Sequence, residues 1–470
     1  MGGSELDFVH EAFETNWIAP LGANVNGFEA DLQSYTGRKH AAAITSGTAG
    51  LHLALILCGV KPGDEVFCQS FTFAASANPI RYQGAVPVFI DSEPDTWNMD
   101  PDLLERALEE RAKASTDDSP APLPGSPVEL SGTDSSTDEF TSSVESYGTP
   151  SSIDDVKSGN TGSDTKYSSV DVKSTGEDSA HTPMKPGLPK AIVVVHLYGM
   201  PAKMDRIMEI ANKYGVPVIE DSAEALGSSI NGRKCGTYGK VSILSFNGNK
   251  IITTSGGGAL LSNDEELVKK ARFLATQARD DAPHYQHSEL GYNYRMSNIV
   301  AGIGRGQMKI LDDHVEARRA NHQFYFENLG QTWWQPSSVR QVPEALPEGS
   351  QPSTFNLEPS TAGSPTGIYF LKEPAGYKSN RWLTTILVNP EETGGITRED
   401  IRLALDEENI ECRPLWKPMH MQPLYKGFPF YGNGVSEMLF EYGLCLPSGS
   451  NLTDDDRERV VSAIQKVLGM

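Results

Sequence analysis

The sequence is poor in positive charge. Its 470 residues include 40 lysines and arginines against 62 aspartates and glutamates, which gives a formal net charge of −22 and an isoelectric point of about 4.9. Binding to nucleic-acid phosphates needs a basic face. We therefore expect no nucleic-acid partner.

Long apolar runs are also missing. No stretch of the sequence reaches the ~18 consecutive apolar residues of a transmembrane helix. The first residues, "MGGSELDFVHEAFETNW", are acidic and amphipathic, and they lack the basic region and apolar core of a secretory signal. We therefore expect no membrane association and a cytoplasmic location.

Cysteine is scarce and scattered. The five cysteines are odd in number and none lies in a CxxC pair: Cys58, Cys68, Cys235, Cys412 and Cys445. This pattern excludes a disulfide framework and a zinc site of the usual spacing. It indicates reduced thiols in a reducing compartment, and we expect no metal site.

Short apolar runs alternate with helical patterns along most of the chain. "AAAIT", "EVFCQ" and "PVFID" are typical of strands, and "AGLHLALILCG" and "FAASANPIRYQG" of helices. The alternation resumes at "AIVVVHLYG", "VPVIED" and "KVSILSF" and predicts an α/β fold with a mostly parallel sheet between helices. Further helices are expected at residues 4–15 and in "NLTDDDRERVVSAIQKVLG", which begins at Asn451 or Thr453 and ends before Gly469.

Two segments interrupt this alternation. Residues 113–189 contain 17 serines and 13 acidic against 5 basic residues, too few apolar side chains to offset the entropy of ordering, so we expect a disordered insertion. A second Pro/Ser-rich patch covers residues 336–366. The rest divides into a large domain, in two parts (1–112 and 190–310), and a smaller C-terminal domain (311–470).

Residues with reactive or ligand-binding side chains follow five of the predicted strands. The ligand crevice of a parallel sheet lies at these strand ends. A Ser46-Gly47-Thr48 turn opens a helix and can either bind phosphate or serve as an N-cap. Phe73 can stack on a planar ring or belong to the core. His196 fits a satisfied histidine near the site as well as a catalytic one.

Asp221 and Lys250 follow the other two strands. Asp221 needs hydrogen bonds or a cation such as a protonated pyridine nitrogen, unless it caps the next turn. Lys250 is either a solvated surface lysine or a desolvated amine that forms a Schiff base with a carbonyl. A phosphate nest, a stacking ring, a carboxylate and such an amine are together what pyridoxal 5′-phosphate requires. We therefore expect this cofactor.

Ordered motifs run from about Asn16 to the C-terminus, outside the two low-complexity segments: "SGTAGLHLAL", "GDEVFCQSFTFAASANPIRYQGAVPVFID", "HLYGMPAKMD", "VIEDSAEALGS", "SFNGNKIITTSGGGAL", "GYNYRMSNIVAGIGRGQM" and "RPLWKPMHMQPLY". Together they resemble the DegT/DnrJ/EryC1/StrS family of sugar aminotransferases. The resemblance implies the fold-type I architecture of pyridoxal-phosphate enzymes: a mostly parallel seven-stranded sheet flanked by helices, and a smaller C-terminal α+β domain. It also implies a homodimer.

The resemblance implies roles for four residues around the cofactor ring. Lys250 would bind the cofactor aldehyde covalently, Asp221 would pair with the pyridine nitrogen, and Phe73 would stack on the ring. Glu224 occupies a position near the cofactor's 3-oxygen where relatives often have glutamine or histidine. A glutamate there would repel that oxygen unless a proton lies between them.

Four further residues would contact the cofactor phosphate. By resemblance, Gly47, Thr48 and Ser245 would hold the phosphate in their own chain. Asn293, in "GYNYRMSN", would reach the phosphate in the neighbouring subunit. The shared site makes the homodimer necessary for activity.

The spacing in "FNGNKIITTSGGGAL" and the segment "SNRWLTT" most resemble enzymes that act on UDP-linked 4-keto-6-deoxy-N-acetylhexosamines. We expect transfer of an amino group from an amino acid, glutamate by resemblance, to C4 of such a sugar. Candidate nucleotide-sugar contacts are Arg381, Trp382, Arg413 and Lys417, although structural ion pairs explain the charged ones equally well. The alternatives are another pyridoxal-phosphate reaction, such as a lyase or dehydratase, and a non-catalytic protein of the same fold.

Overall fold

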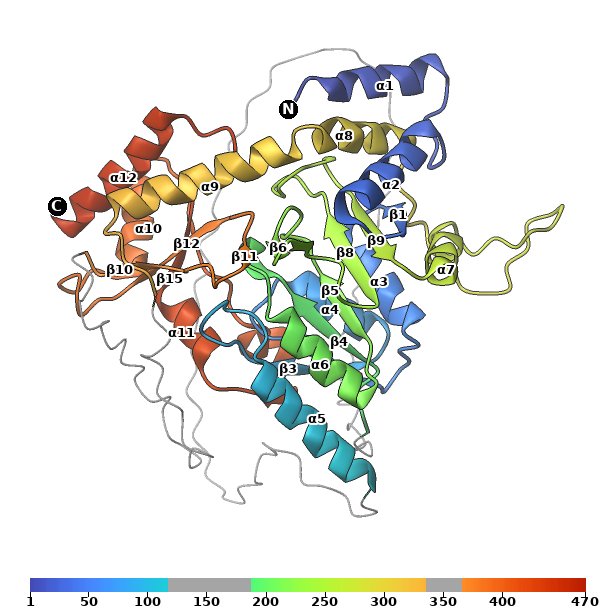
Figure 1. Cartoon of the computed structure of the whole chain (residues 1–470), viewed down its shortest axis with the longest axis horizontal. Coiled ribbons are helices and arrows are strands. Elements are labelled where there is room, and N and C mark those ends of the chain that lie inside the picture. Colours follow the sequence, from blue (N-terminus) through green and yellow to red (C-terminus); the bar gives the residue numbers. More distant parts are fainter. Residues whose placement is uncertain (117–186, 335–365) are drawn as a thin grey trace, which may run out of the picture. The chain divides into compact units, whose positions relative to one another are not determined.

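The computed structural model describes residues 1–116, 187–334 and 366–470. The predicted alternation forms one large sheet with the strand order β1-β9-β8-β5-β4-β2-β3-β14 (Figure 1). Its strands are β1 (His40–Ile44), β2 (Glu65–Gln69), β3 (Val86–Ile90), β4 (Ala191–Val195), β5 (Val218–Asp221), β8 (Val241–Ser245), β9 (Gly258–Ser262) and β14 (Phe430–Tyr431). β9 is antiparallel to both neighbours, and the other pairs are parallel.

The expected seven strands are therefore present, with β14 added at one edge. This two-residue strand comes from the C-terminal part of the chain and pairs in parallel with β3. No sequence pattern predicted it, because two residues are too few to show a period.

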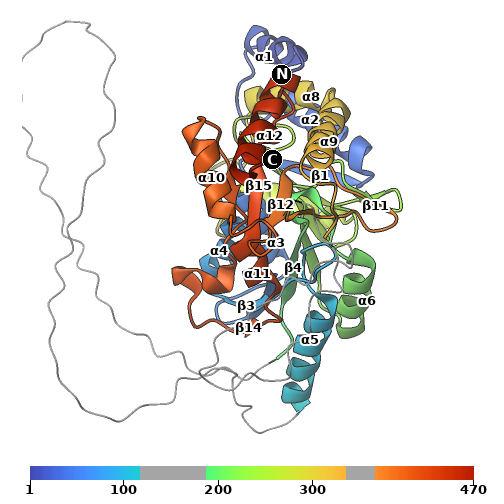
Figure 2. The same ribbon diagram turned by 90° about the vertical axis from the view of Figure 1, so that its left-hand side faces the viewer.

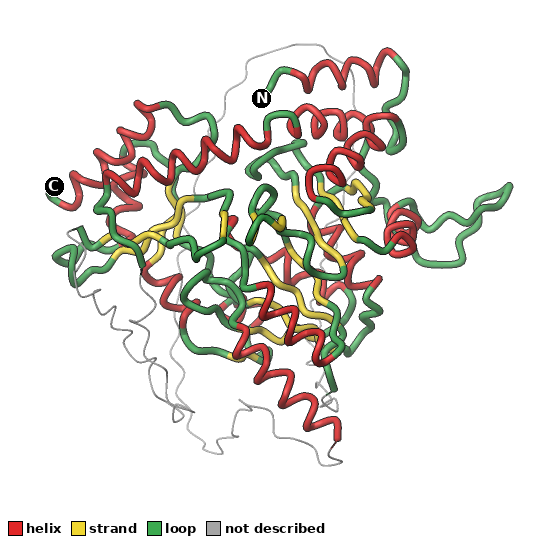
Figure 3. The backbone as a smooth tube through the Cα atoms, in the orientation of Figure 1, coloured by secondary structure: helices red, strands yellow, loops and turns green. Residues whose placement is uncertain are grey.

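Helices cover both faces of the sheet (Figures 2 and 3). α3 (Gly47–Leu57), α4 (Ala74–Tyr82) and α7 (Glu265–Ala275) pack on one face, and α5 (Pro101–Thr116) and α6 (Met204–Tyr214) on the other. Alternate side chains of β2 explain this: Val66 and Cys68 pack on the first face and Phe67 on the second. Burial on both faces is why these strands are apolar at nearly every position.

A third helical group packs beside β1, β8 and β9. It consists of α2 (Ala23–Thr36), α8 (Asn298–Met308) and the start of α9 (Leu311–Asn328). α1 (Ser4–Glu14) lies against α8, in agreement with the helix expected at residues 4–15.

Residues after α9 build a second sheet. It is antiparallel, with the order β10 (Ile368–Phe370), β12 (Thr384–Val388), β15 (Gly443–Leu446) and β13 (Arg413–Pro414). α10 (Arg398–Glu407) and α12 (Asp454–Leu468) pack on it with α9, while α11 (Val435–Tyr442) joins another apolar cluster. A small antiparallel sheet is formed by β11 (Tyr377–Lys378), β6 (Ser229–Ile230) and β7 (Arg233–Lys234).

The last helix has the expected boundaries. Thr453 is its N-cap and forms a capping box with Asp456, and Gly469 follows it with φ 70°. A left-handed residue after a helix is most easily a glycine. Of the two predicted starting residues, Thr453 rather than Asn451 is the cap.

The boundaries of the predicted insertion need correction. α5 continues to Thr116, past the expected start at residue 113, because its last residues keep helix-forming side chains such as Ala112 and Ala114. At the other end, Pro189 is buried beside β4. The remainder of the predicted insertion, residues 117–186, lies outside the described residues.

The second patch is likewise almost entirely outside the described residues, which resume at Thr366. This residue is buried, and its hydroxyl donates to the carbonyl of Leu329 at the end of α9 (2.7 Å). The division at residue 310 stays a prediction. The C-terminal segment does not stay separate from the large sheet, since β14 returns to it.

Among the described residues, we find no helix with the length and apolar character needed to cross a bilayer. All five cysteines lie in described segments and none forms a disulfide. Within these same segments, no group of three or more His, Cys, Asp or Glu side chains is arranged to hold a metal ion.

Candidate active site

A cavity of about 300 Å³ lies at the carboxyl ends of β1, β2, β5 and β8. Parallel strands bring their carboxyl ends to one edge, so residues far apart in sequence meet there. Nine of the residues singled out from the sequence line this cavity: Ser46, Gly47, Thr48, Phe73, Asp221, Glu224, Ser245, Lys250 and Trp382.

The N-terminus of α3 forms one end of the cavity. Ser46 is its N-cap and accepts a hydrogen bond from the N–H of Ala49 (3.1 Å). A Cβ on Gly47 would lie 3.0 Å from Cβ of Ser245 on β8, so glycine lets the helix approach that strand closely. The first N–H groups of a helix have no partner inside it, and with the helix dipole they attract an anion. The N-cap and the candidate phosphate-binding turn are therefore the same feature, and the two alternatives for this turn do not exclude each other.

Asp221 ends β5 and points into the cavity with 4% of its surface exposed. Its carboxylate accepts hydrogen bonds from the hydroxyl of Ser76 (2.7 Å) and the N–H of Ala223 (3.2 Å). Burial raises the pKa of Asp221, although the bond from Ser76 acts against this. Both donors are neutral, so a cationic ring nitrogen would supply the charge that this buried carboxylate needs.

Lys250 follows β8, as the sequence predicted. Its side chain is only 10% exposed, and Nζ lies 3.3 Å from Oε1 of Glu224 and 4.3 Å from the centre of the Trp382 ring. The indole N–H of Trp382 donates to the carbonyl of Asn249 (2.8 Å) and so holds the preceding residue. The amine is thus directed into the cavity rather than into solvent.

Two of the three glycines after Lys250 lie where a Cβ would not fit. A Cβ on Gly258 would lie 2.5 Å from the carbonyl carbon of Ser46 and 2.6 Å from the nitrogen of Gly47. A Cβ on Gly257 would meet Oγ1 of Thr254 at 2.3 Å. The returning strand therefore passes close to the start of α3, and the turn and Lys250 line the same cavity.

Aromatic rings form another wall. Phe73 is 56% exposed and lies 5.2 Å from Trp416, between ring centres. Trp416 in turn lies 5.4 Å from Tyr198 and 6.2 Å from Trp382. An exposed phenylalanine at a cavity does not fit the core alternative and leaves its ring available for stacking.

Three of the four sugar-nucleotide candidates do not line the cavity. Arg381 is buried, and its guanidinium donates to the carbonyl of Leu371 (2.9 Å) and faces Glu373. Arg413 is exposed and paired with Glu411 (2.7 Å). The structural alternative therefore describes these two arginines better than a substrate contact does.

Lys417 is half-buried next to Trp416, outside the cavity lining. Asn293 is exposed and also outside the lining of its own chain. Its segment is held nearby by Arg295, whose Nη1 donates to Glu29 (2.6 Å) and to the carbonyl of Ala43 (2.8 Å). Asn293 therefore lies on the surface, two residues from a segment anchored by Arg295.

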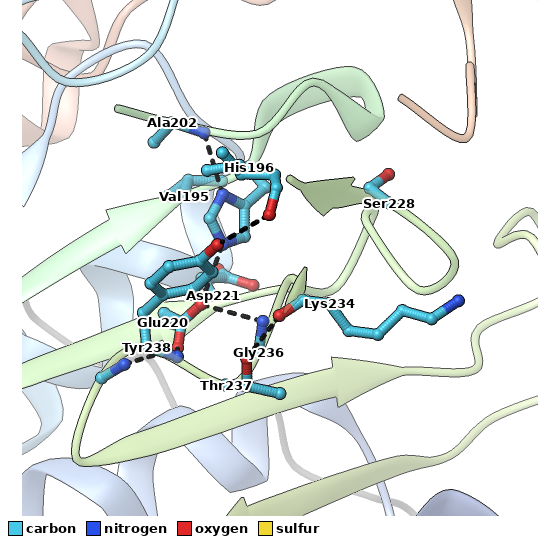
Figure 4. Close-up of polar contacts among 12 residues, drawn as sticks. Val195, His196, Ala202, Glu220, Asp221, Ser228, Lys234, Gly236, Thr237 and Tyr238 are labelled. Atoms are coloured by element: carbon cyan, nitrogen blue, oxygen red, sulfur yellow. Dashed lines mark hydrogen bonds and ion pairs between the residues drawn. The ribbon is translucent and has the colours of Figure 1, made fainter. Parts of the chain in front are cut away.

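His196 belongs to a buried network of polar contacts with Glu220 and Ala202 (Figure 4). Its Nδ1 accepts the N–H of Ala202 (3.0 Å), and its Nε2 donates to Glu220 (3.1 Å). Glu220 also accepts the N–H groups of Gly236 (2.8 Å) and Tyr238 (2.6 Å). Both ring nitrogens of His196 are therefore engaged, which supports the interpretation as a satisfied histidine.

Ser76 and Trp416 are among the lining residues that were not singled out from the sequence. Ser76 appeared only as part of a helical pattern in "FAASANPIRYQG", and Trp416 only as part of the family motif "RPLWKPMHMQPLY". Ser76 lies on the helix that follows β2, one of the strands whose carboxyl ends carry candidate site residues. This position is the sequence signal that could have pointed to Ser76.

The sequence profile of the DegT/DnrJ/EryC1/StrS aminotransferase family matches residues 1–118, 170–344 and 364–465. The chain belongs to this family, and it is a pyridoxal-phosphate-dependent aminotransferase.

Individual relatives of the chain support the same family assignment. Over 468 residues, the chain is 44% identical to EpsN of Bacillus subtilis (strain 168), provisionally named a pyridoxal phosphate-dependent aminotransferase, with 99% of this chain and 93% of EpsN covered. It is 31% identical to the GDP-perosamine synthase of Caulobacter vibrioides, with 100% and 96% covered. A DegT DnrJ EryC1 StrS aminotransferase from Brucella abortus has a similar crystal structure (TM-score 0.71, 25% identity, 99% and 96% covered).

Proposed function

We propose that this enzyme transfers an amino group from glutamate to C4 of a nucleotide-linked 4-keto-6-deoxy sugar, with UDP as the nucleotide. The observation that carries the proposal is the buried amine of Lys250 facing the same cavity as Asp221. The names of the relatives support a nucleotide-sugar substrate, since one is a GDP-perosamine synthase. The choice of UDP rests on the resemblance of the segment "SNRWLTT".

The residues around the cavity fit the cofactor of the family. Gly47, Thr48 and Ser245 would hold its phosphate at the N-terminus of α3. Phe73 would stack on the ring, and Asp221 would keep a proton on the ring nitrogen. The cofactor supplies an aldehyde carbon and a ring that accepts electrons.

Lys250 has two tasks in this proposal. Its amine would bind the cofactor aldehyde covalently, and as a free amine it would take a proton from the amino-acid substrate and return it, acting as base and then as acid. Trp382 limits where the amine can move, because its ring lies 4.3 Å from Nζ. Only 10% of the Lys250 side chain is exposed, which limits the water that could compete for that proton.

A homodimer is part of the proposal. Asn293 lies at the base of a loop that follows α7 and extends away from the sheet (Figure 1). Tyr285 and Leu290 in this loop are 78% and 76% exposed. Exposed apolar side chains around an anchored segment are consistent with a contact to a second copy, in whose site Asn293 would reach the phosphate.

For the sugar nucleotide, we retain Trp382 and Lys417 and add Trp416, because both tryptophans line the cavity and Lys417 adjoins one of them. Arg381 and Arg413 are less suitable, since each already has a partner within the described residues.

The test is a panel of 4-keto-6-deoxy sugars linked to UDP, GDP and TDP, incubated with ¹⁵N-glutamate and analysed by product mass. We expect ¹⁵N in an amino sugar, fastest with the UDP substrate. A sugar product without nitrogen would instead indicate a lyase or dehydratase. The absence of any product together with retained cofactor would indicate a non-catalytic protein.

A further inference from the structure

Glu224 and Lys250 form a buried acid–base pair at the centre of the cavity. Glu224 is 3% exposed, and its Oε1 lies 3.3 Å from Nζ of Lys250. Its other oxygen, Oε2, accepts the N–H of Tyr198 (2.7 Å). One carboxylate oxygen is thus held by the backbone, and the other faces the amine.

The backbone that holds Glu224 is itself fixed. Tyr198 has φ 53°, a left-handed conformation that is unfavourable for a residue with a Cβ. The adjacent Gly199 leaves room for Asn380, because a Cβ there would lie 1.9 Å from Oδ1 of that residue. Asn380 donates to the carbonyl of Glu224 (2.8 Å), and Ser228 donates to that of Gly199 (2.7 Å). The orientation of the Tyr198 N–H, and hence of Glu224, is therefore determined by packing.

Four titratable groups face Glu224, each from a different element. They are Lys250 after β8, Asp221 in β5, Tyr198 before α6 and Cys445 in β15. Burial raises the pKa of Tyr198 and of Cys445 well above neutral, so neither exchanges a proton near neutral pH. Asp221 has Ser76 and Ala223 as hydrogen-bond donors, whereas Oε1 of Glu224 faces the amine directly.

We propose that Glu224 is a catalytic residue that exchanges a proton with Lys250. Oε1 takes a proton from the Nζ ammonium: an N–H bond breaks, an O–H bond forms, and the nitrogen keeps the electron pair. The amine is then free to attack a carbonyl or to act as a base, and the carboxylic acid later returns the proton. This inference rests on the proposed aminotransferase role of Lys250.

The local environment suits this exchange. Burial raises the pKa of Glu224 to about 7, although the nearby Lys250 acts to lower it. A carboxyl group with such a pKa both accepts and releases a proton near neutral pH. As pH falls through this range, the carboxylate becomes protonated from solvent and can no longer accept the proton of Lys250. Turnover should therefore decrease on the acid side of pH 7.

The first test compares Glu224→Gln with wild type in the holoenzyme. Glutamine keeps the shape and an oxygen for the Tyr198 N–H, but it cannot take a proton. We expect kcat to fall by about 10²-fold or more, the magnitude of general acid–base catalysis, and the acid limb of its pH profile to disappear. Glu224→Asp should recover part of the rate together with the limb. An unchanged rate and profile in Glu224→Gln would overturn the proposal and leave Glu224 with a structural role.

The second test measures the amine itself and needs no sugar substrate, so it is independent of whether the proposed reaction is correct. The full chain without cofactor is labelled with trinitrobenzenesulfonate, and modification of Lys250 is followed by peptide mass spectrometry across pH. Loss of the carboxylate removes the negative charge that stabilises the Nζ ammonium, so labelling of Lys250 near pH 7 should increase by about tenfold. Glu105→Gln is the matched control, since Glu105 pairs with Lys213 (2.8 Å) away from the cavity lining. Equal labelling of Lys250 in wild type and Glu224→Gln would contradict the proposed interaction between Glu224 and Lys250.

Discussion

Ser76→Ala should change the pH range in which the enzyme retains its cofactor. Ser76 lies in α4, and its hydroxyl donates to Oδ2 of Asp221 (2.7 Å), which burial already places at a raised pKa. A hydrogen bond to a charged group contributes about 1.5–3 kcal/mol. Because one pKa unit corresponds to about 1.4 kcal/mol, its loss should raise the pKa of Asp221 by about 1–2 units.

The direction of the shift in cofactor affinity follows from the charge that Asp221 must carry to bind the cofactor. The carboxylate pairs with a protonated ring nitrogen only when it is ionised, so cofactor affinity falls as pH decreases through the pKa of Asp221. A higher pKa moves this loss to higher pH. In Ser76→Ala, the acid-side midpoint of the affinity profile should therefore shift upward by about 1–2 pH units, while affinity at alkaline pH stays near that of wild type.

The assay is titration of the cofactor-free protein with pyridoxal 5′-phosphate, followed by visible absorbance at a series of pH values. Thr72→Val is the matched control. It removes a hydroxyl from the same network, since Oγ1 of Thr72 lies 2.8 Å from Oγ of Ser76, but it has no hydrogen bond to Asp221. The reasoning fails if the midpoint of Ser76→Ala stays at the wild-type value, or if Thr72→Val shifts it equally.

Three further predictions follow from the same geometry. Lys250→Ala should lose both turnover and the absorbance band of covalently bound cofactor while the chain stays folded by circular dichroism; retained turnover would contradict the assignment. Gly258→Ala should destabilise the protein by about 1–3 kcal/mol in urea unfolding, because its Cβ would lie 2.5 Å from the backbone before α3. Gly256→Ala is the control, since Gly256 has open space around it and the substitution should change stability little. Equal effects of the two substitutions would argue against the close approach. Asn293→Ala co-expressed with Lys250→Ala should recover activity through one intact site per mixed dimer; activity no greater than the sum of the separate variants would mean that Asn293 does not serve the partner.

The positions of the central site residues could be predicted from local sequence patterns. Gly47, Asp221 and Lys250 each follow an apolar strand, and the carboxyl ends of parallel strands meet at one edge whatever the details of packing. The strand order did not have to be known for this argument. It was sufficient that the alternation of strands and helices predicted a parallel sheet.

The candidate contacts to the sugar nucleotide could not be predicted in this way. Arg381 was selected because a cation beside an aromatic residue suits a nucleotide. Its backbone has φ 50°, however, and its side chain is directed to Leu371, while that of its neighbour Trp382 lines the cavity. Adjacent residues outside regular secondary structure have no fixed periodicity, so which one faces a ligand depends on the tertiary packing of that segment.

By itself, the sequence determined the fold class and the family, and it placed the candidate amine and carboxylate at strand ends, because these depend on periodicity and on residues that directly follow strands. Only the tertiary structure decided that Ser76 supports Asp221 across 145 residues of sequence, that Trp416 completes the aromatic wall, and that Glu224 faces Lys250. These contacts join separate elements, and their distances are set by how helices and strands pack. A local pattern contains no information on that packing, since side chains within a few ångströms of each other need not be close in the chain.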